Sequence, residues 1–332
     1  MNVVLLEVSH WHTPLYLDAL ERLSGVTVTA VSDATGSRGP AIANRFDARC
    51  YDHWQALLDS EVADFAFVFG PHDELYSMGR ALINRQMPFA MEKPCGLSQH
   101  EVLDLYQRAE EKGLRVAVPL VWRHSDLPRR LKQSALQSEA SWRTMSFRFN
   151  AGPPGRYLEN SCSWMLDPRR SGGGCTINLA VHFVDLILEI SGEPIRSVSA
   201  VMYRDPLQAE VEIGSMITLV TASGCICNIE TGYNYPGGTA EQREYSFSLS
   251  ANRFYARSTP DGFRLIDGEG RACDVEMSLN SDIYYDNFVT DILSQGRGAG
   301  GVSAGLETMH QVMRIIDAAY ESDRLGGIPI KL

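Results

Sequence analysis

The stretch Pro-Phe-Ala-Met-Glu-Lys-Pro-Cys-Gly, residues 88–96, decides the fold class of this chain. Its apolar part, Pro88 to Met91, predicts a short buried strand, and Pro94 ends that strand because proline has no N–H for a ladder. Lys93 then lies just past the carboxyl end of a buried strand, where open α/β sheets bind their ligands. A partly desolvated lysine can shift its pKa toward neutrality and handle protons. The alternative is a surface lysine beside a turn proline.

Strands and helices alternate on both sides of this stretch. The predicted strands are 3–7, 26–31, 65–69, 88–91 and 115–121, and the predicted helices between them are 14–24, 40–46, 52–58, 73–85 and 99–112. A repeated β-α-β order with short connections indicates a parallel, doubly wound sheet. We therefore expect an α/β domain over residues 1–122.

The rest of the chain has a different pattern. Strands are predicted at 141–150, 196–203, 212–222, 225–235 and 245–255, separated by turn signals such as Ser223-Gly224. Consecutive strands without intervening helices favour an antiparallel sheet. One helix is expected at about 175–191, after three glycines, and a last one at about 303–320, which could pack back on the first domain. Residues 123–332 are thus predicted to form an α+β domain.

Composition excludes several classes of protein. The chain has 332 residues and a net charge of −11, which argues against a surface for nucleic acid or anionic membranes. No apolar run approaches the roughly 20 residues of a membrane span, and the run after the first Met is too short for a secretory signal. The seven cysteines have no framework spacing, although Cys225 and Cys227 should share one face of a strand. We expect reduced thiols in a cytoplasmic protein.

The turn after the first strand, residues 7–12, contains no glycine. The helix that begins at Thr13-Pro14 would still favour an anion through its dipole and free N–H groups. Ser9 and Thr13 could add hydroxyl donors, and His10 and His12 could line the same mouth, which predicts a cofactor or substrate site. A His-x-His metal site, as in barrel hydrolases, is one alternative. A loop without function is the other.

Asp33 stands at the carboxyl end of the second strand. A carboxylate there can accept hydrogen bonds from the ribose of NAD and would repel a 2′-phosphate. Arg38 could do the opposite for NADP. The alternative for Asp33 is a turn or cap residue.

Asn178, His182 and Asp185 are spaced four and three residues apart, so a helix places them on one face. His182 can act as a general acid or base, while its apolar neighbours make a buried structural histidine the alternative. Further polar residues could meet a polyhydroxylated substrate, although each alone fits a surface or packing role. They are Arg123, His124, Arg156, Tyr157, Trp164 and Tyr235.

Several of these motifs occur together in one known family. They are Glu92-Lys93-Pro94, the triple glycine 172–174 followed by the helical His182-Phe-Val-Asp185, then Gly192-Glu-Pro194, and the closing stretch 318–322. In this combination and over nearly its whole length, the chain resembles the Gfo/Idh/MocA family of NAD(P)-dependent oxidoreductases.

The resemblance implies a Rossmann domain followed by a substrate-binding domain with a large, open, mostly antiparallel sheet. That sheet would form homo-oligomers, dimers or tetramers. The implied reaction is hydride transfer between NAD or NADP and a secondary alcohol or ketone of a sugar, cyclitol or related polyol. Lys93 would contact the reacting hydroxyl and the nicotinamide ribose, with Glu92 beside it at the cofactor. His182 would be the proton acceptor or its partner, Asn178 would assist it, and Arg123 and Asp185 would line the substrate site.

The chain departs from the family pattern at the cofactor. The glycine motif is absent, and Asn178 replaces an Asp, so it can orient a hydroxyl but cannot act as a base. Gly70-Pro71-His72 replaces Thr-Pro-Asn, so we assign these three residues to the cofactor as well. Two alternative functions remain open. One is a non-catalytic sensor of the same fold that binds a nucleotide or sugar. The other is a metal hydrolase using His10 and His12, which would need a barrel of eight βα units; the leading interpretation assigns no metal ligand.

Overall fold

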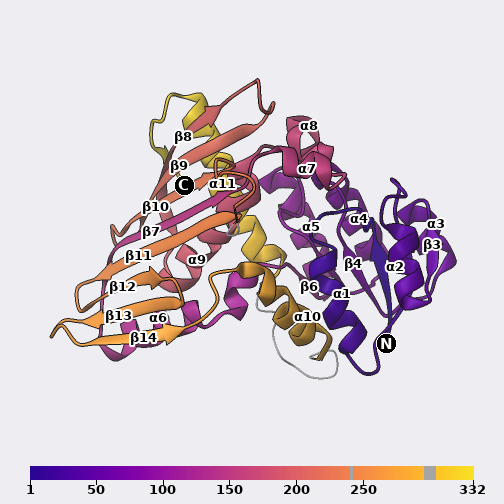
Figure 1. The fold of residues 1–332 in the computed structure, drawn as a ribbon, viewed down its shortest axis with the longest axis horizontal. Coiled ribbons are helices and arrows are strands. Elements are labelled where there is room, and N and C mark those ends of the chain that lie inside the picture. Colours follow the sequence, from indigo (N-terminus) through magenta and orange to yellow (C-terminus); the bar gives the residue numbers. More distant parts are fainter. Residues whose placement is uncertain (240–241, 295–303) are drawn as a thin grey trace. The chain divides into compact units, whose positions relative to one another are not determined.

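The computed structural model describes residues 1–239, 242–294 and 304–332. The chain forms two compact units (Figure 1). Unit 1 comprises Met1–Leu120, Tyr157–Gly172 and Asp282–Gln311, and unit 2 comprises Val121–Arg156, Gly173–Ser281 and Val312–Leu332. The chain first passes from unit 1 to unit 2 after Leu120, two residues before the expected domain boundary at residue 122. Two later segments, which the sequence pattern placed in the second domain, group with unit 1.

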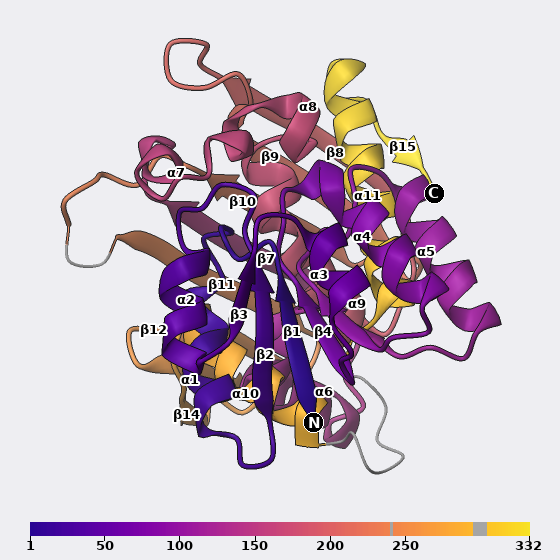
Figure 2. The same cartoon turned by 90° about the vertical axis from the view of Figure 1, so that its right-hand side faces the viewer.

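Unit 1 is built on a six-stranded sheet with the order β3-β2-β1-β4-β5-β6. Its strands are β1 Asn2–Leu6, β2 Thr27–Ser32, β3 Arg49–Tyr51, β4 Phe65–Val68, β5 Phe89–Met91 and β6 Val116–Ala117. All neighbouring strands run parallel, and β3, β2, β1 and β4 can be followed side by side in Figure 2. The predicted doubly wound sheet is confirmed. This sheet is open and has six strands, whereas a His-x-His hydrolase would need a closed barrel of eight strands. The hydrolase alternative is therefore wrong for this chain.

The helices of unit 1 are α1 Pro14–Arg22, α2 Gly39–Phe46, α3 Trp54–Ser60, α4 His72–Asn84, α5 Gln99–Glu111, the short α8 Pro168–Ser171 and α10 Tyr284–Ser294. They cover strands whose apolar runs are almost fully buried. Local chemistry fixes where helices begin: at α5, Ser98 accepts a hydrogen bond from the Glu101 N–H, and the Glu101 carboxylate accepts one from Leu97 N–H at 2.7 Å.

Unit 2 is built on a nine-stranded sheet with the order β14-β13-β12-β11-β7-β10-β9-β8-β15. Its strands are β7 Trp142–Ala151, β8 Ile195–Arg204, β9 Glu212–Thr221, β10 Ile226–Gly232, β11 Arg243–Ala251, β12 Phe254–Thr259, β13 Gly262–Asp267, β14 Ala272–Glu276 and β15 Ile330–Lys331. Only β7 and β10 pair in parallel, so the predicted mostly antiparallel sheet is confirmed. The predicted strand 245–255 is two strands, because the chain bends at Asn252-Arg253. The pattern did not predict β13, β14 or β15.

One face of this sheet is covered and the other is open. Met145, Phe147 and Phe149 alternate with polar residues along β7 and are buried, and the ring of Phe183 stacks on Phe147 at 5.5 Å. Phe183 belongs to α9 Val181–Ser191, which follows a π-helical turn at Thr176–Ala180 and packs beside α6 Asp126–Gln137. The segment Pro168–Ser191 is long and apolar enough to cross a membrane, but 83% of its most apolar window is buried, as in a core helix.

Two helices contain residues of both units. They are the short α7 Gly155–Glu159 and the last helix, α11 Leu306–Arg324. The residues of α11 up to Gln311 group with unit 1 and the others with unit 2. The predicted start of the last helix, Ser303, lies outside the described residues.

Two glycines of unit 2 are required by close approach. Gly173 has φ +151°, and a Cβ there would overlap the Tyr320 hydroxyl. A Cβ on Gly174 would overlap the Glu212 carbonyl oxygen and come within 3.0 Å of Val211 Cβ. Behind them, Glu212 Oε1 accepts hydrogen bonds from Tyr320 OH at 2.8 Å and from Thr176 N–H at 3.0 Å. The backbone of β9 therefore cannot move away to admit a side chain.

We predict that Gly174→Ala destabilises the protein by about 1–3 kcal/mol, because the obstructing atom is backbone. Gly155→Ala is the matched control, since no atom lies within 4 Å of its Cβ position and its φ is not positive. The control should change the free energy of unfolding by no more than about 1 kcal/mol. Chemical denaturation of both variants measures this, and equal stability of the two would contradict the packing argument.

Candidate functional site

The predicted site residues lie on both units, and we describe each half by itself. Unit 1 holds the turn residues Ser9, His10, His12 and Thr13, and also Asp33, Arg38, Gly70, Pro71, His72, Glu92, Lys93, Tyr157 and Trp164. Unit 2 holds Arg123, His124, Arg156, Asn178, His182, Asp185 and Tyr235.

The first turn of unit 1 is shaped by Glu7, which the sequence reasoning did not assign to the site. Glu7 has φ +54°, a conformation that glycine adopts more readily. Its buried carboxylate accepts hydrogen bonds from Ser32 Oγ at 3.2 Å, Ala34 N–H at 3.0 Å and Trp54 N–H at 3.1 Å. Burial raises the pKa of Glu7 against these hydrogen bonds. The sequence signal for this role was an acidic residue, Glu7, directly after the apolar strand residues 3–6.

The Asp33 carboxylate accepts hydrogen bonds from residues of its own turn. Its Oδ1 accepts hydrogen bonds from Thr35 N–H at 3.0 Å and Thr35 Oγ1 at 2.7 Å, and its Oδ2 accepts from the N–H groups of Arg38 and Gly39, both at 2.8 Å. Burial would raise the pKa of Asp33, but these hydrogen bonds lower it below its usual value. This is the arrangement of a turn and cap residue. The Arg38 guanidinium lies 3.1 Å from Asn160 Oδ1. The ribose roles of both residues stay predictions.

A buried polar cluster lies at the carboxyl ends of the parallel strands. Its members come from the first turn, the start of α4 and the end of β5, and each is at most 5% exposed: Ser9, His10, His12, His72, Glu92 and Lys93. Lys93 is thus a buried lysine, and the surface alternative is wrong. Gly70 lies just before α4, and a Cβ there would overlap only Met78 Cε, the flexible end of that side chain. Pro71 precedes the first residue of α4.

The His72 ring has a defined tautomer. Its Nδ1 lies 2.7 Å from the Ser171 carbonyl oxygen, so Nδ1 donates and Nε2 carries the lone pair. Burial, and then the charge of Lys93, lower the pKa of His72 to about 3, so the ring is neutral. Nε2 is buried and has no hydrogen-bond partner among the described residues.

His10, His12 and Glu92 are close neighbours. The His12 N–H donates to His10 Nδ1 at 3.1 Å, and Tyr16 OH donates to Glu92 Oε1 at 2.6 Å. His12 Nδ1 lies 3.1 Å from Glu92 Oε2 and 3.2 Å from Tyr285 OH. Burial, and then the neighbouring imidazole of His12, lower the pKa of His10 well below its usual value. His10 therefore carries no charge at neutral pH.

The segment 157–166 covers this cluster within unit 1. The Trp164 ring lies 4.8 Å from the His72 ring and 5.6 Å from the His10 ring. Tyr157 packs edge-on against Trp11 at 5.9 Å, and Cys162 Sγ lies 3.4 Å from the Ser9 carbonyl oxygen. Tyr157 and Trp164, predicted to bind substrate, thus lie against the turn predicted to bind the cofactor.

The turn after β1 has some features that suit a dinucleotide and lacks others. The strand order places β1 at the switch point, and Thr13 Oγ1 and His72 Nε2 are buried polar atoms without a hydrogen-bond partner among the described residues. Thr13, His72 and Lys93 are the residues that would hold the pyrophosphate and ribose. Ser9 is 5% exposed beside the segment 157–166.

The half of the site in unit 2 begins with the π-helical turn at Thr176–Ala180. A single π turn within an α-helix is frequently found at functional sites. Asn178 Nδ2 donates to Tyr233 OH at 2.9 Å, and the Arg156 guanidinium lies 5.3 Å from the centre of the Tyr233 ring. His182 follows in α9 and is 9% exposed. Tyr233, which the sequence reasoning missed, therefore links Asn178 and Arg156, whereas Tyr235 is half-buried and its N–H donates to the Ala151 carbonyl.

Asp185 and Arg123 form a buried ion pair. Arg123 Nε lies 2.9 Å from Asp185 Oδ2, and Nη2 lies 2.7 Å from Oδ1. Arg123 Nη1 also pairs with Glu189 at 2.6 Å, and Glu189 pairs with Lys132. Burial raises the pKa of Asp185 although Arg123 opposes the shift. The pair joins α9 to the 3₁₀ turn Val121–His124, and the substrate roles of both residues stay predictions.

We predict that Arg123→Met destabilises the protein by about 3–5 kcal/mol, because it leaves the buried Asp185 charge unpaired. The double variant Arg123→Met/Asp185→Leu should recover most of that loss, since it removes both charges. Free energies of unfolding for the wild type, both single variants and the double variant complete the cycle. Additive effects would show that the two side chains do not act as a pair.

Comparison with known proteins agrees with the fold. Residues 10–120 match the profile of the oxidoreductase family with an NAD-binding Rossmann fold, and residues 141–253 match the GFO/IDH/MocA C-terminal domain. No curated protein matches the sequence significantly.

Solved structures with the same fold cover the full length of this chain. They include an inositol dehydrogenase homolog from Azotobacter vinelandii complexed with NAD+ (14% identity, TM-score 0.86, 100% of this chain and 97% of that one). GenD2 from gentamicin A biosynthesis, in complex with NAD, is 20% identical (TM-score 0.83, 100% and 96%). Levoglucosan dehydrogenase, in complex with NADH and levoglucosan, is 15% identical (TM-score 0.83, 100% and 99%). The two matched profiles together span about two-thirds of the chain, and this protein therefore belongs to the Gfo/Idh/MocA family of NAD-binding oxidoreductases.

Proposed function

We propose that this oxidoreductase acts on a secondary alcohol or ketone of a sugar, cyclitol or related polyol, with Lys93 and His182 as its catalytic residues. The observation that carries the proposal is the burial of Lys93 at the carboxyl end of β5, next to uncharged imidazoles. Open parallel sheets bind their ligands at the carboxyl ends of their strands, so a lysine buried there is placed to meet a reacting group. The names of similar structures, an inositol dehydrogenase homolog and levoglucosan dehydrogenase, support this substrate class.

The chemistry assigns one role to each residue. The nicotinamide, when bound, accepts or supplies the hydride. The Lys93 ammonium donates a hydrogen bond to the reacting oxygen and stabilises negative charge that develops there. His182 accepts the hydroxyl proton during oxidation and returns it during reduction. Asn178 orients a substrate hydroxyl through its amide, whose Nδ2 is held by Tyr233.

We predict that Lys93→Ala lowers turnover of the best polyol substrate by at least about a hundredfold, because it removes the charge opposite the developing alkoxide. His182→Asn should lower turnover by about 10²–10⁴-fold and remove the corresponding pKa from the pH profile. Lys112→Ala, at an exposed lysine, is the control and should be fully active.

Calorimetric titration of each variant with NAD(H) and NADP(H) separates binding from chemistry. The proposal requires the inactive variants to bind the preferred nucleotide within about tenfold of the wild type. Wild-type turnover by Lys93→Ala would refute the assigned mechanism. A folded wild type that binds neither nucleotide would favour the non-catalytic sensor.

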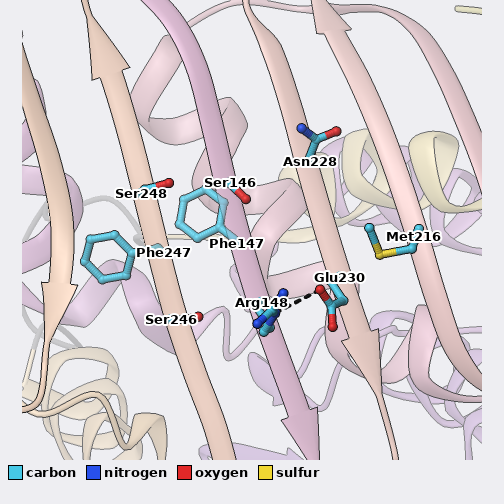
Figure 3. A pocket seen from close by; sticks show the side chains of 9 residues that line it. All are labelled: Ser146, Phe147, Arg148, Met216, Asn228, Glu230, Ser246, Phe247 and Ser248. Atoms are coloured by element: carbon cyan, nitrogen blue, oxygen red, sulfur yellow. Dashed lines mark hydrogen bonds and ion pairs between the residues drawn. The ribbon is translucent and has the colours of Figure 1, made fainter.

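We also propose that the open face of the nine-stranded sheet forms a homo-oligomer. Strand register places Val201, Met216, Glu230, Arg148 and Ser246 in one row across β8, β9, β10, β7 and β11. Figure 3 shows the last four of these side chains, with the Arg148–Glu230 ion pair at 2.8 Å. Val201 is 62% and Met216 55% exposed. Adjacent exposed apolar side chains, flanked by polar ones, are typical of a protein interface.

We predict that Met216→Asp dissociates the oligomer, because it places a charge in the apolar part of the interface. Light scattering coupled to size-exclusion chromatography would show a dimer or tetramer for the wild type and a smaller species for the variant. Leu207→Asp, at a loop residue that is 98% exposed, is the control and should leave the mass unchanged. A monomeric wild type would refute this interface.

The seven cysteines of the chain form no disulfide, which supports our proposal that the protein works in the cytoplasm.

A further inference from the structure

His10, His12 and Glu92 carry potential metal-binding atoms that all lie within 4.8 Å of one another. All three residues belong to unit 1, and each is at most 5% exposed. His10 and His12 stand on the turn after β1, where this family usually has glycines, and Glu92 follows β5. We propose that these three side chains bind one divalent transition-metal cation of the zinc class.

The donor set selects the kind of ion. Two imidazoles and one carboxylate are three protein ligands, the number found in zinc sites that keep a fourth position open. The same set also binds iron(II). Magnesium and calcium prefer sites made of oxygen alone. The open position would take water or an oxygen atom of a bound small molecule.

The distance between His12 Nδ1 and Glu92 Oε2 fits a shared cation. The two atoms lie 3.1 Å apart, yet Glu92 Oε2 has no hydrogen-bond partner of acceptable geometry among the described residues. Two ligand atoms that each lie about 2.0–2.1 Å from one ion are about 3 Å apart. A buried carboxylate oxygen and a ring nitrogen at this distance need a proton or a cation between them.

The surrounding side chains hold the proposed ligands in place. Tyr16 OH donates to Glu92 Oε1 at 2.6 Å, which fixes the carboxylate and leaves Oε2 for the ion. Tyr285 OH lies 3.2 Å from His12 Nδ1. The His12 N–H donates to His10 Nδ1 at 3.1 Å, which orients the His10 ring. Outer partners of this kind orient metal ligands in characterised sites.

The charge of the cluster is compatible with an added cation. The cluster contains one carboxylate side chain, Glu92, and one amine side chain, Lys93, both buried. Lys93 disfavours a further positive charge nearby, and an anionic oxygen ligand at the fourth position would offset this. The cation would cross-link the glycine-free turn to the end of β5. This role does not depend on the substrate or on His182.

The test is titration of the purified, tag-free and metal-stripped full-length protein with cobalt(II), followed by its visible absorption, and elemental analysis of the protein as isolated. We expect one cobalt ion per chain, a rise in thermal stability on binding, and competition by zinc. His12→Ala should weaken binding by about a hundredfold or more. His53→Ala and His100→Ala remove exposed histidines and should bind as the wild type does.

Two further variants keep the test decisive. Glu92→Gln keeps the shape of the side chain, so it replaces His12→Ala if that variant does not fold, which circular dichroism would show. Cys225→Ser is a control, because Cys225 and Cys227 could bind cobalt through sulfur atoms that lie 3.8 Å apart. This variant should bind cobalt as the wild type does. No stoichiometric binding by the wild type, or equal binding by folded His12→Ala and Glu92→Gln, would overturn the proposal. Nucleotide titration of the same samples tests the oxidoreductase function separately.

Discussion

Unit 1 depends on satisfying the polar groups that are buried where its parallel strands end. A carboxylate or ammonium removed from water is costly unless other groups replace its hydrogen bonds. Glu7 meets this requirement with Ser32 and two backbone N–H groups, and Glu92 meets part of it with Tyr16. The remaining donors and acceptors, His72 Nε2 and Glu92 Oε2 among them, are the groups available for ligands. The same constraint thus explains both the shape of the turn and the position of the site.

In unit 2, buried carboxylates are stabilised mainly by pairing with other side chains. Asp185 is fully buried and is held by two N–H groups of Arg123. Glu212 is buried beneath the two glycines and accepts from Tyr320 and from a backbone N–H. Both arrangements fix α9 and the turn before it, and so they hold Asn178 and His182 in a defined position within this unit.

The departures from the family pattern are connected. Glycines normally let a dinucleotide approach the first turn, and here Glu7 takes up the positive φ while His10 and His12 fill the space. Trp164 and Cys162 then pack on the same turn. The turn and the residues that cover it are therefore packed together within unit 1.

The sequence by itself determined the two fold classes, the position of Lys93 just past the end of a strand and the sharing of one face by Cys225 and Cys227. These features follow from local periodicity and from proline at a strand end, which depend only on neighbours along the chain. The sequence missed Tyr233 and Glu7, and it placed Tyr157 and Trp164 with the substrate. Only the tertiary structure decided that Asp33 caps its own turn and that Glu92 lies beside His12, since 80 residues separate that pair and no spacing rule relates them. Contacts of this range arise when strands pair out of sequence order, as β1 does between β2 and β4.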